Sequence, residues 1–238
     1  MKVNWGLLKF VLLTSLIVLL FGFTKKRNQE RKLTKIDIEF LDQNAPFITR
    51  NSVNKMLIQN HDSVTSLSKE TLVLKEMESR LLQNEMIRDA NVFVTVDGQL
   101  GAKIEQRNPI ARVSASPDYY IDEDGEKMPL SSVYTARVPL VTGNVTKIQS
   151  QLTHLVQNIR ADEFMNKSVV GIDVANEEMV LLRMRKHNYK VLFGDTNAID
   201  LKFQNYKAFY QKAKQDKTLE DYKTVDLRFG SQVVATKK

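Results

Sequence analysis

Three histidines and no cysteine limit the metal and redox chemistry that this 238-residue chain can offer. His61, His154 and His187 lie far apart and show neither an H-x-x-x-H nor an H-x-x-H spacing, so they predict no metal site. We expect His154, in a helix, and His187, in a turn, to be solvated. A chain without cysteine has no disulfide, thiolate metal site, iron–sulfur cluster or cysteine nucleophile. It is also compatible with an oxidising compartment, because no thiol could be misoxidised there.

Phosphate-binding and nucleophile motifs are also missing. The nine glycines are scattered singly, with no G-x-G-x-x-G, Walker or G-x-S-x-G pattern. The acidic run 122–126 resembles the start of a calcium loop, but Val133 occupies the twelfth position, where a glutamate ligand is required. We interpret this run as a β-turn. The sequence therefore predicts no catalytic, metal-binding or cofactor-binding residue, no cofactor, no enzymatic activity and no small-molecule substrate.

The charge balance favours anionic surroundings. Lys and Arg number 35 against 28 Asp and Glu, a net charge of +7, which does not distinguish nucleic acid from phospholipid or acidic wall polymers. A helix predicted over 199–217 separates its aromatic residues from its lysines, with Phe203, Tyr206 and Tyr210 on one face and Lys202, Lys207, Lys212 and Lys214 on the other. Stacking of bases needs both kinds of side chain on one surface. We therefore expect aromatic core residues, solvated lysines and no nucleic-acid partner.

The N-terminal run from Val3 to Phe23 is apolar apart from Lys9, and roughly 20 such residues suffice to cross a bilayer. No A-x-A-like cleavage site follows it, and no cysteine is present for lipid attachment. We predict a cytoplasmic tail at 1–4, an uncleaved transmembrane signal-anchor at 5–23 and a linker at 24–35. The basic residues that follow the run outnumber those before it, which by itself would keep the large domain in the cytoplasm. The residues alone leave this topology open.

Two α+β units follow the linker. The first has the pattern strand, helix, helix, strand, strand: a strand at 36–40, a helix capped by Thr49, a helix capped by Ser68, and a hairpin of strands 91–96 and 100–105 around Asp97-Gly98. The second unit is richer in strands. Its predicted elements are a helix over 148–159, strands at 169–174, 179–184 and 189–193, the helix over 199–217, and a strand pattern at 224–235 that Gly230 interrupts.

Three segments carry a resemblance to a known family. Within 74–113 the chain shows Leu81-x-x-Asn84, Ile87-x-x-Ala90-x-Val92 and then Ile-Glu-x-Arg-x-Pro-Ile-Ala. The others are Tyr119-Tyr120-Ile121-Asp122-x-x-Gly125 and the segment 225–229. Together they resemble the FtsQ (DivIB) family of bacterial cell division proteins. The resemblance implies an α+β chain: one N-terminal transmembrane helix, a POTRA domain (β-α-α-β-β) at 36–110, and an FtsQ-type mixed α/β "β domain" with an antiparallel-rich sheet at 111–238.

The same resemblance implies a single-pass inner-membrane protein enriched at the division septum, with residues 31–238 in the periplasm, against the local charge count. It further implies a non-enzymatic divisome scaffold that links early and late division proteins and recruits FtsB and FtsL, beside other divisome proteins. Two alternatives remain: a POTRA-containing protein of membrane-protein translocation or assembly, and a membrane-anchored cell-wall enzyme. The first would carry a C-terminal barrel, for which the chain is too short. The second needs catalytic residues that the sequence does not reveal.

The resemblance also points to a partner-binding segment. If the C-terminal strand ends a sheet, its free backbone edge can pair with an extended partner segment. The family's arginine and following aromatic map onto Arg228 and Phe229, although no C-terminal aromatic follows the strand here. The expected partner-binding residues are Val225, Asp226, Leu227, Arg228, Phe229, Ser231 and Val233. In the alternative interpretation Val225, Leu227 and Phe229 form an inward-facing row, Asp226 and Arg228 are solvated, and a bulge at Gly230-Ser231 turns later residues outward.

Overall fold

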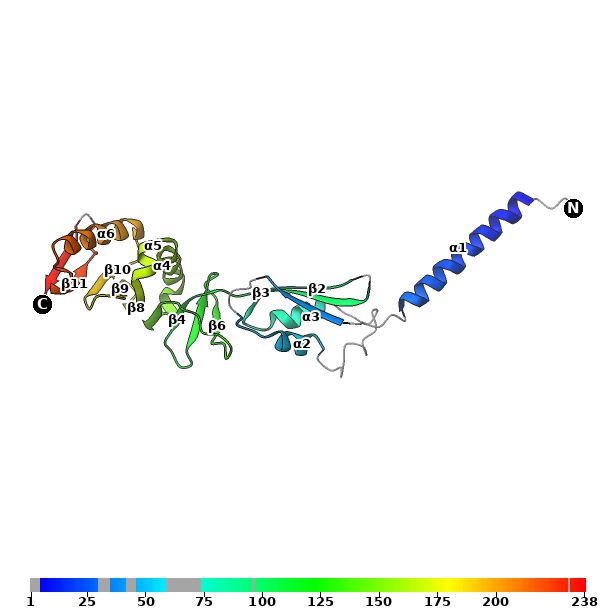
Figure 1. Ribbon diagram of the computed structural model, residues 1–238, viewed down its shortest axis with the longest axis horizontal. Coiled ribbons are helices and arrows are strands. Elements are labelled where there is room, and N and C mark those ends of the chain that lie inside the picture. Colours follow the sequence, from blue (N-terminus) through cyan, green and yellow to red (C-terminus); the bar gives the residue numbers. More distant parts are fainter. Residues whose placement is uncertain (1–4, 30–34, 42–45, 59–73, 96, 231) are drawn as a thin grey trace. The chain divides into compact units, whose positions relative to one another are not determined.

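The computed structural model describes the chain except for residues 1–4, 30–34, 42–45, 59–73, 96 and 231 (Figure 1). His61 and the expected helix cap Ser68 lie outside the described residues. The chain divides into two compact units, Met1–Gln106 and Arg107–Lys238. Each unit is built around its own sheet and its own hydrophobic core.

The N-terminal helix α1 (Trp5–Gln29) continues past Phe23 into the segment that the sequence predicts to be a linker. Its large apolar side chains are exposed: Trp5, Phe10, Val11, Leu12, Leu13, Leu16, Ile17, Val18, Leu19, Leu20, Phe21 and Phe23. Among the residues that the structure describes, no helix combines the length and apolarity of a membrane span. The transmembrane helix predicted at 5–23 is therefore not confirmed.

The first unit has the predicted β-α-α-β-β order. Its elements are β1 (Lys35–Phe40), α2 (Arg50–Leu57), α3 (Leu74–Leu82), β2 (Ile87–Val94) and β3 (Gln99–Gln106). The sheet has the order β1-β3-β2, with β1 parallel and β2 antiparallel to the central strand β3. The two helices pack on the sheet through apolar side chains that include Val53, Leu57, Met77 and Leu81.

Local sequence explains how these elements begin and turn. The Thr49 hydroxyl accepts a hydrogen bond from the Ser52 amide at 3.1 Å, which caps α2 as predicted. Gly98 has a φ of 84° in the turn between β2 and β3, a conformation that glycine adopts without strain. The hairpin predicted around Asp97-Gly98 is thus confirmed.

The second unit is one mixed sheet covered by helices. Its strands are β4 (Pro109–Val113), β5 (Tyr119–Asp122), β6 (Lys127–Pro129), β7 (Leu140–Gly143), β8 (Val169–Asn176), β9 (Met179–Met184), β10 (Lys190–Gly194), β11 (Tyr222–Asp226) and β12 (Val234–Lys237). In the described residues their order is β12-β11-β10-β9-β8-β7-β4-β5-β6. Neighbours are antiparallel except for three parallel pairs, β10–β11, β7–β8 and β4–β7. The predicted antiparallel-rich mixed sheet is confirmed.

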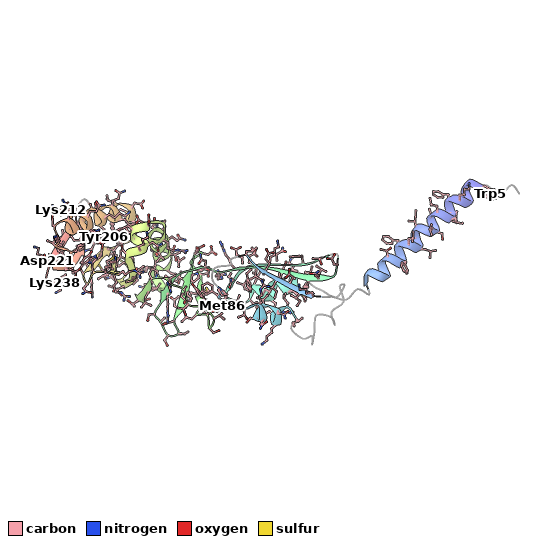
Figure 2. The ribbon with its side chains drawn as sticks, in the orientation of Figure 1. Trp5, Met86, Tyr206, Lys212, Asp221 and Lys238 are labelled. Atoms are coloured by element: carbon pink, nitrogen blue, oxygen red, sulfur yellow. The ribbon has the colours of Figure 1, made fainter. Side chains whose placement is uncertain are left out.

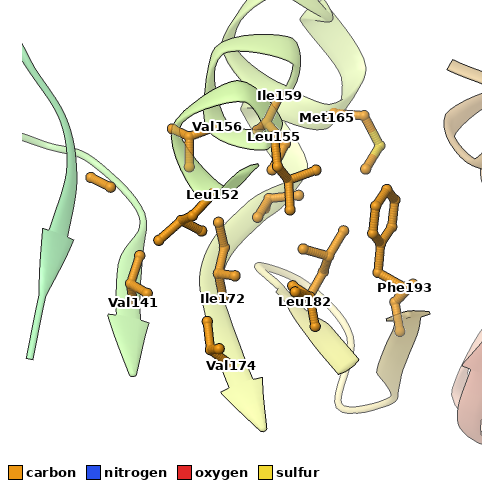
Figure 3. Close-up of a cluster of buried hydrophobic side chains, with 14 of the residues drawn as sticks. Val141, Leu152, Leu155, Val156, Ile159, Met165, Ile172, Val174, Leu182 and Phe193 are labelled. Atoms are coloured by element: carbon orange, nitrogen blue, oxygen red, sulfur yellow. The ribbon is translucent and has the colours of Figure 1, made fainter. Parts of the chain in front are cut away.

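Two parallel pairs are joined by helical crossovers. A 3-10 turn η2 (Thr146–Ile148), α4 (Gln149–Ala161) and α5 (Glu163–Ser168) connect β7 to β8, and α6 (Ile199–Gln215) with η3 (Leu219–Asp221) connects β10 to β11. Figure 3 shows Leu152, Leu155 and Ile159 of α4 facing Ile172 and Leu182 of the sheet. All five side chains are fully buried. This core fixes the sheet on which the C-terminal strands lie.

Candidate functional site

The strand pattern predicted at 224–235 forms two strands instead of one. After Asp226 the chain leaves β11, and Gln232 donates its amide to the Phe229 carbonyl at 2.8 Å. It then returns antiparallel as β12. Asn205 of α6 holds this connection, because its side-chain amide donates to the Gly230 carbonyl at 2.8 Å. The interruption expected at Gly230 is therefore a chain reversal.

At the C-terminal end of the sheet, the edge strand is β12, and β6 is the edge strand at the opposite end. β11 is paired on both sides, parallel with β10 and antiparallel with β12, so Val225 and Asp226 offer no open backbone. The Leu227 amide donates to the Leu192 carbonyl, and the Lys238 amide donates to the Asp221 carbonyl. Because backbone groups point to alternate sides along a strand, those of Thr236 also face β11. The backbone N–H and C=O groups of Ala235 and Lys237 then point away from the sheet. Figure 2 shows Asp221 and Lys238 together at this end of the unit.

The expected partner-binding residues divide into buried and exposed sets. Val225 and Leu227 are fully buried in the core, and Val233 packs against it half-buried. Phe229, which strict alternation would place in the core, is 46% exposed because β11 has already ended at Asp226. Ser231 lies outside the described residues. Phe229 and part of Val233 are thus accessible, whereas Val225 and Leu227 pack in the core and hold the hairpin on the sheet.

Arg228 is held by its neighbour Asp226. Its Nε lies 2.9 Å from Oδ1 of Asp226, and its terminal nitrogen lies 2.5 Å from Oδ2, a bidentate ion pair. The hydrogen bond from Arg228 lowers the pKa of the Asp226 carboxyl below its ordinary value. Gly194, with a φ of 77°, leaves room for this arrangement, since a Cβ there would lie 2.7 Å from Cγ of Arg228. Asp226 is therefore buried and paired, and not solvated as in the alternative interpretation.

A groove lies between α6 and the β11–β12 hairpin. It has a volume of about 380 Å³, and its apolar lining includes Phe209 of α6, Tyr222 of β11 and Val233 before β12. Lys212 lines the same groove, and Lys237 and Lys238 end the chain beside it. No pattern in the sequence indicates this groove, because the predicted aromatic face of α6 does not include Phe209 and the other wall depends on the chain reversal. An extended segment paired with β12 could place an apolar side chain here.

Two side chains expected in solvent are not solvated. Lys202 is 7% exposed, because its ammonium donates to the Asp195 carboxylate at 2.6 Å and lies over the ring of Phe193. His187 has a side chain only 12% exposed, stacked on Tyr189 and hydrogen-bonded to Glu220 at 3.0 Å. Lys207, Lys212 and Lys214 are partly or fully exposed. The basic face of α6 is therefore smaller than predicted, because Lys202 is not part of it.

The acidic run 122–126 is a turn, as interpreted from the sequence. The Asp122 carboxylate accepts the amides of Asp124 and Glu126 at 3.0 and 2.7 Å and pairs with Arg107 at 2.7 Å. Throughout the described ranges, no group of three or more His, Asp or Glu side chains is arranged to hold a metal ion. The arrangement at β12 has the chemistry of a protein-binding edge, with open backbone groups, an adjacent apolar groove and nearby lysines.

Comparison with known families first defines the class of protein. Residues 31–105 match the model of the POTRA-like domain, so the chain is a POTRA-like unit followed by a mixed α/β domain. Residues 108–236, more than half of the chain, match the family described as FtsQ/DivIB, C-terminal related. The chain belongs to this FtsQ/DivIB family. Its domains imply a role in cell division and a location at the septum. No curated protein matches the chain.

Proposed function

We propose that the chain is a non-enzymatic divisome scaffold that recruits the FtsB–FtsL pair and so links early to late division proteins at the septum. The observation that carries the proposal is the outer edge of β12, which no other described strand covers. An extended segment of a partner adds to such an edge by main-chain hydrogen bonds, while side-chain pockets beside it supply selectivity. The outward groups of Ala235 and Lys237 set the register of that pairing.

Side chains around β12 define the partner segment that fits best. The groove lined by Phe209, Tyr222 and Val233 accepts an apolar side chain on the helix side of the edge. Lys237 and Lys238 favour acidic residues along the incoming strand, because opposite charges steer association and exclude like-charged segments. Among the seven residues expected from sequence, Arg228, Phe229 and Val233 are the proposed contacts. Val225, Leu227 and Asp226 position them.

Membrane attachment is a part of the proposal that rests on the sequence. We assign residues 5–23 as the signal-anchor, 24–35 as linker, 36–110 as the POTRA domain and 111–238 as the β domain, with 31–238 in the periplasm. The support is the largely apolar run of α1, whose large apolar side chains are exposed from Trp5 to Phe23 in the described residues. Alkaline phosphatase fused to the C-terminus should be active in cells. An inactive fusion with normal expression would contradict this topology.

Binding of FtsB–FtsL is tested by co-purification with the full chain in detergent. Deletion of residues 234–238 removes β12 and should abolish binding, while the buried Val225 and Leu227 stay in place. A cut after Lys223 is a poorer test, because it would also remove those core side chains. Arg228→Glu should weaken binding, and Arg160→Glu, at a similarly exposed arginine on α4, serves as the matched control.

The outcomes separate the edge from the side chains. Loss of binding on deletion of 234–238, with an unchanged circular dichroism spectrum, supports strand addition at β12. An additional loss in Arg228→Glu but not in Arg160→Glu places the guanidinium in the contact. Undiminished binding by the deletion variant would overturn recruitment through this edge. No binding by the intact chain would overturn the proposed partner.

A further inference from the structure

The POTRA-like unit has an unpaired strand edge of its own, at β2. The Thr95 amide donates to the Gln99 carbonyl at 2.9 Å, toward β3. Because backbone groups alternate along a strand, those of Asn91 and Phe93 also face β3, and those of Ala90, Val92 and Val94 face away from the sheet. No other described strand lies on that side. β2 therefore presents three outward amides in a row.

The composition of this edge favours pairing with another strand. Residues 90–94 read Ala-Asn-Val-Phe-Val, without charge or proline and rich in β-branched and aromatic side chains. Soluble proteins usually protect such edges with lysines, prolines or bulges along the strand itself. Residues 90–94 contain no lysine and no proline, and the register shift in β2 lies before them, between Ile87 and Asp89. Protection must come from side chains outside residues 90–94.

Carboxylates occupy two of the three outward amides. Glu78 Oε1 accepts the Val92 amide at 2.8 Å, and Asp89 Oδ1 accepts the Ala90 amide at 2.9 Å. Glu78 belongs to α3, whose Met77 and Leu81 are buried in the core of the unit. That packing fixes α3 beside β2 and places the half-buried Glu78 over the edge. An incoming carbonyl cannot bond to Val92 until this carboxylate leaves.

We propose that Glu78 keeps the β2 edge closed, and that a second copy of this chain pairs antiparallel along β2 when the carboxylate is removed. A two-fold axis at Val92 places Val92 opposite its own copy and Ala90 opposite Val94 of the second copy. These are the residues whose backbone groups face outward. Without Glu78, the Val92 and Val94 amides can donate to the second copy in this register, and the Ala90 amide can donate once the Asp89 carboxylate turns away. Every pair in it is uncharged, so no like charges oppose the contact.

The oligomeric state of the full chain in detergent tests the proposal. Light scattering after gel filtration should give twice the wild-type protein mass for Glu78→Ala. The fraction of this dimer should increase with protein concentration. Glu78→Gln keeps an acceptor oxygen and should retain the wild-type mass. Glu76→Ala, an exposed carboxylate of the same helix, is the matched control and should also retain it. A wild-type mass for Glu78→Ala, or the same shift in Glu76→Ala, would overturn the proposal.

The site of pairing is tested with introduced cysteines, since the chain has none of its own. In the Glu78→Ala background, Asn91→Cys on β2 should cross-link with a short bis-maleimide. Lys103→Cys, its neighbour on the central strand β3, should cross-link far less. Equal cross-linking of both would place the contact elsewhere and overturn pairing along β2.

A measurement on the unaltered chain covers the case in which Glu78→Ala does not fold. Residue-resolved hydrogen exchange should find the Val92 amide about tenfold slower than the Val94 amide, as expected for one additional hydrogen bond. Both amides face the same edge, but only Val92 has a side-chain acceptor in the described part of the chain. Equal exchange rates would show that Glu78 does not close the edge.

Discussion

The edge strands β2 and β12 present the same backbone chemistry with opposite protection. Each ends its sheet among the described residues, and each turns alternate amides outward. On β2 the amides of Ala90 and Val92 are bonded by carboxylates of Asp89 and Glu78. On β12 the outward groups of Ala235 and Lys237 lie beside an apolar groove and two terminal lysines. Carboxylates thus occupy two outward amides of β2, whereas an apolar groove lies beside β12, the edge proposed for partner binding.

The difference shows that topology alone does not identify a binding edge. Both strands end their sheets, so strand order alone would rank them equally. What separates them is the side chains that neighbouring helices bring to the edge: a carboxylate from α3 at β2, and the apolar side chain of Phe209 from α6 at β12. A helix beside an edge can therefore block strand addition or make it selective.

The largest expected effect is on partner binding at β12. Ala235→Pro removes an outward amide and inserts a ring where the added strand would lie, so we expect the Kd for FtsB–FtsL to rise about a hundredfold. Ala235→Val keeps the amide and is the matched control, with a change of less than about threefold. Calorimetric titration of the purified full chain measures both. Equal affinities for the two variants would show that FtsB–FtsL does not pair with the β12 edge.

The second effect concerns how β2 is held on its sheet. A Cβ at Gly101 would lie 2.4 Å from the ring of Phe93, which covers this glycine from the neighbouring strand. Gly101→Val should therefore displace the ring and lower the free energy of unfolding of the POTRA-like unit by about 2 kcal/mol. Lys103→Val, an exposed position on the same strand, is the control for β-propensity. Denaturant unfolding that finds both variants equally stable would contradict the close packing of Phe93 on Gly101.

Much of the framework could be predicted from the sequence because it depends on local patterns. Three features are each formed by residues that are close together in the sequence: the Thr49 cap, the Asp97-Gly98 turn and the apolar stripe of α4. The strands β4, β6 and β7 were not predicted, because they are only three to five residues long and show little alternation. Short segments of this kind become strands only when a neighbouring strand pairs with them.

The sites were less predictable, because they depend on contacts between distant segments. Glu78 and Val92 are 14 residues apart and belong to different elements, so no spacing rule indicates their hydrogen bond. Lys202 fits a solvated helix face by periodicity but lies in the first turn of α6, where it reaches back to Asp195. The location of the free edge on β12 required the reversal after Phe229, which the strand pattern did not reveal.

A smaller effect is expected at the ion pair below the β11–β12 connection. Asp226→Asn removes the bidentate pair with the half-exposed Arg228 and should lower the free energy of unfolding by about 1 kcal/mol at neutral pH. The hydrogen bond from Arg228 lowers the pKa of Asp226, so this stabilisation is present above the ordinary aspartate pKa and is lost as the pH falls through the lowered value. The difference between wild type and variant should therefore shrink in acid below about pH 4. A difference that is constant with pH would contradict the pairing.

The smallest effect is expected at Glu39, whose carboxylate forms an exposed ion pair. Glu39 on β1 and Glu78 on α3 are carboxylates of the same unit, but Glu39 contacts the exposed ammonium of Lys103 at 3.7 Å, whereas Glu78 bonds a strand amide. An exposed ion pair contributes little, so Glu39→Gln should change the free energy of unfolding by less than about 0.5 kcal/mol. Glu39→Ala should also leave the protein mass in light scattering unchanged. If it caused the association expected of Glu78→Ala, negative charge on the sheet in general would keep the copies apart, and the specific hydrogen bond to Val92 would not be the cause.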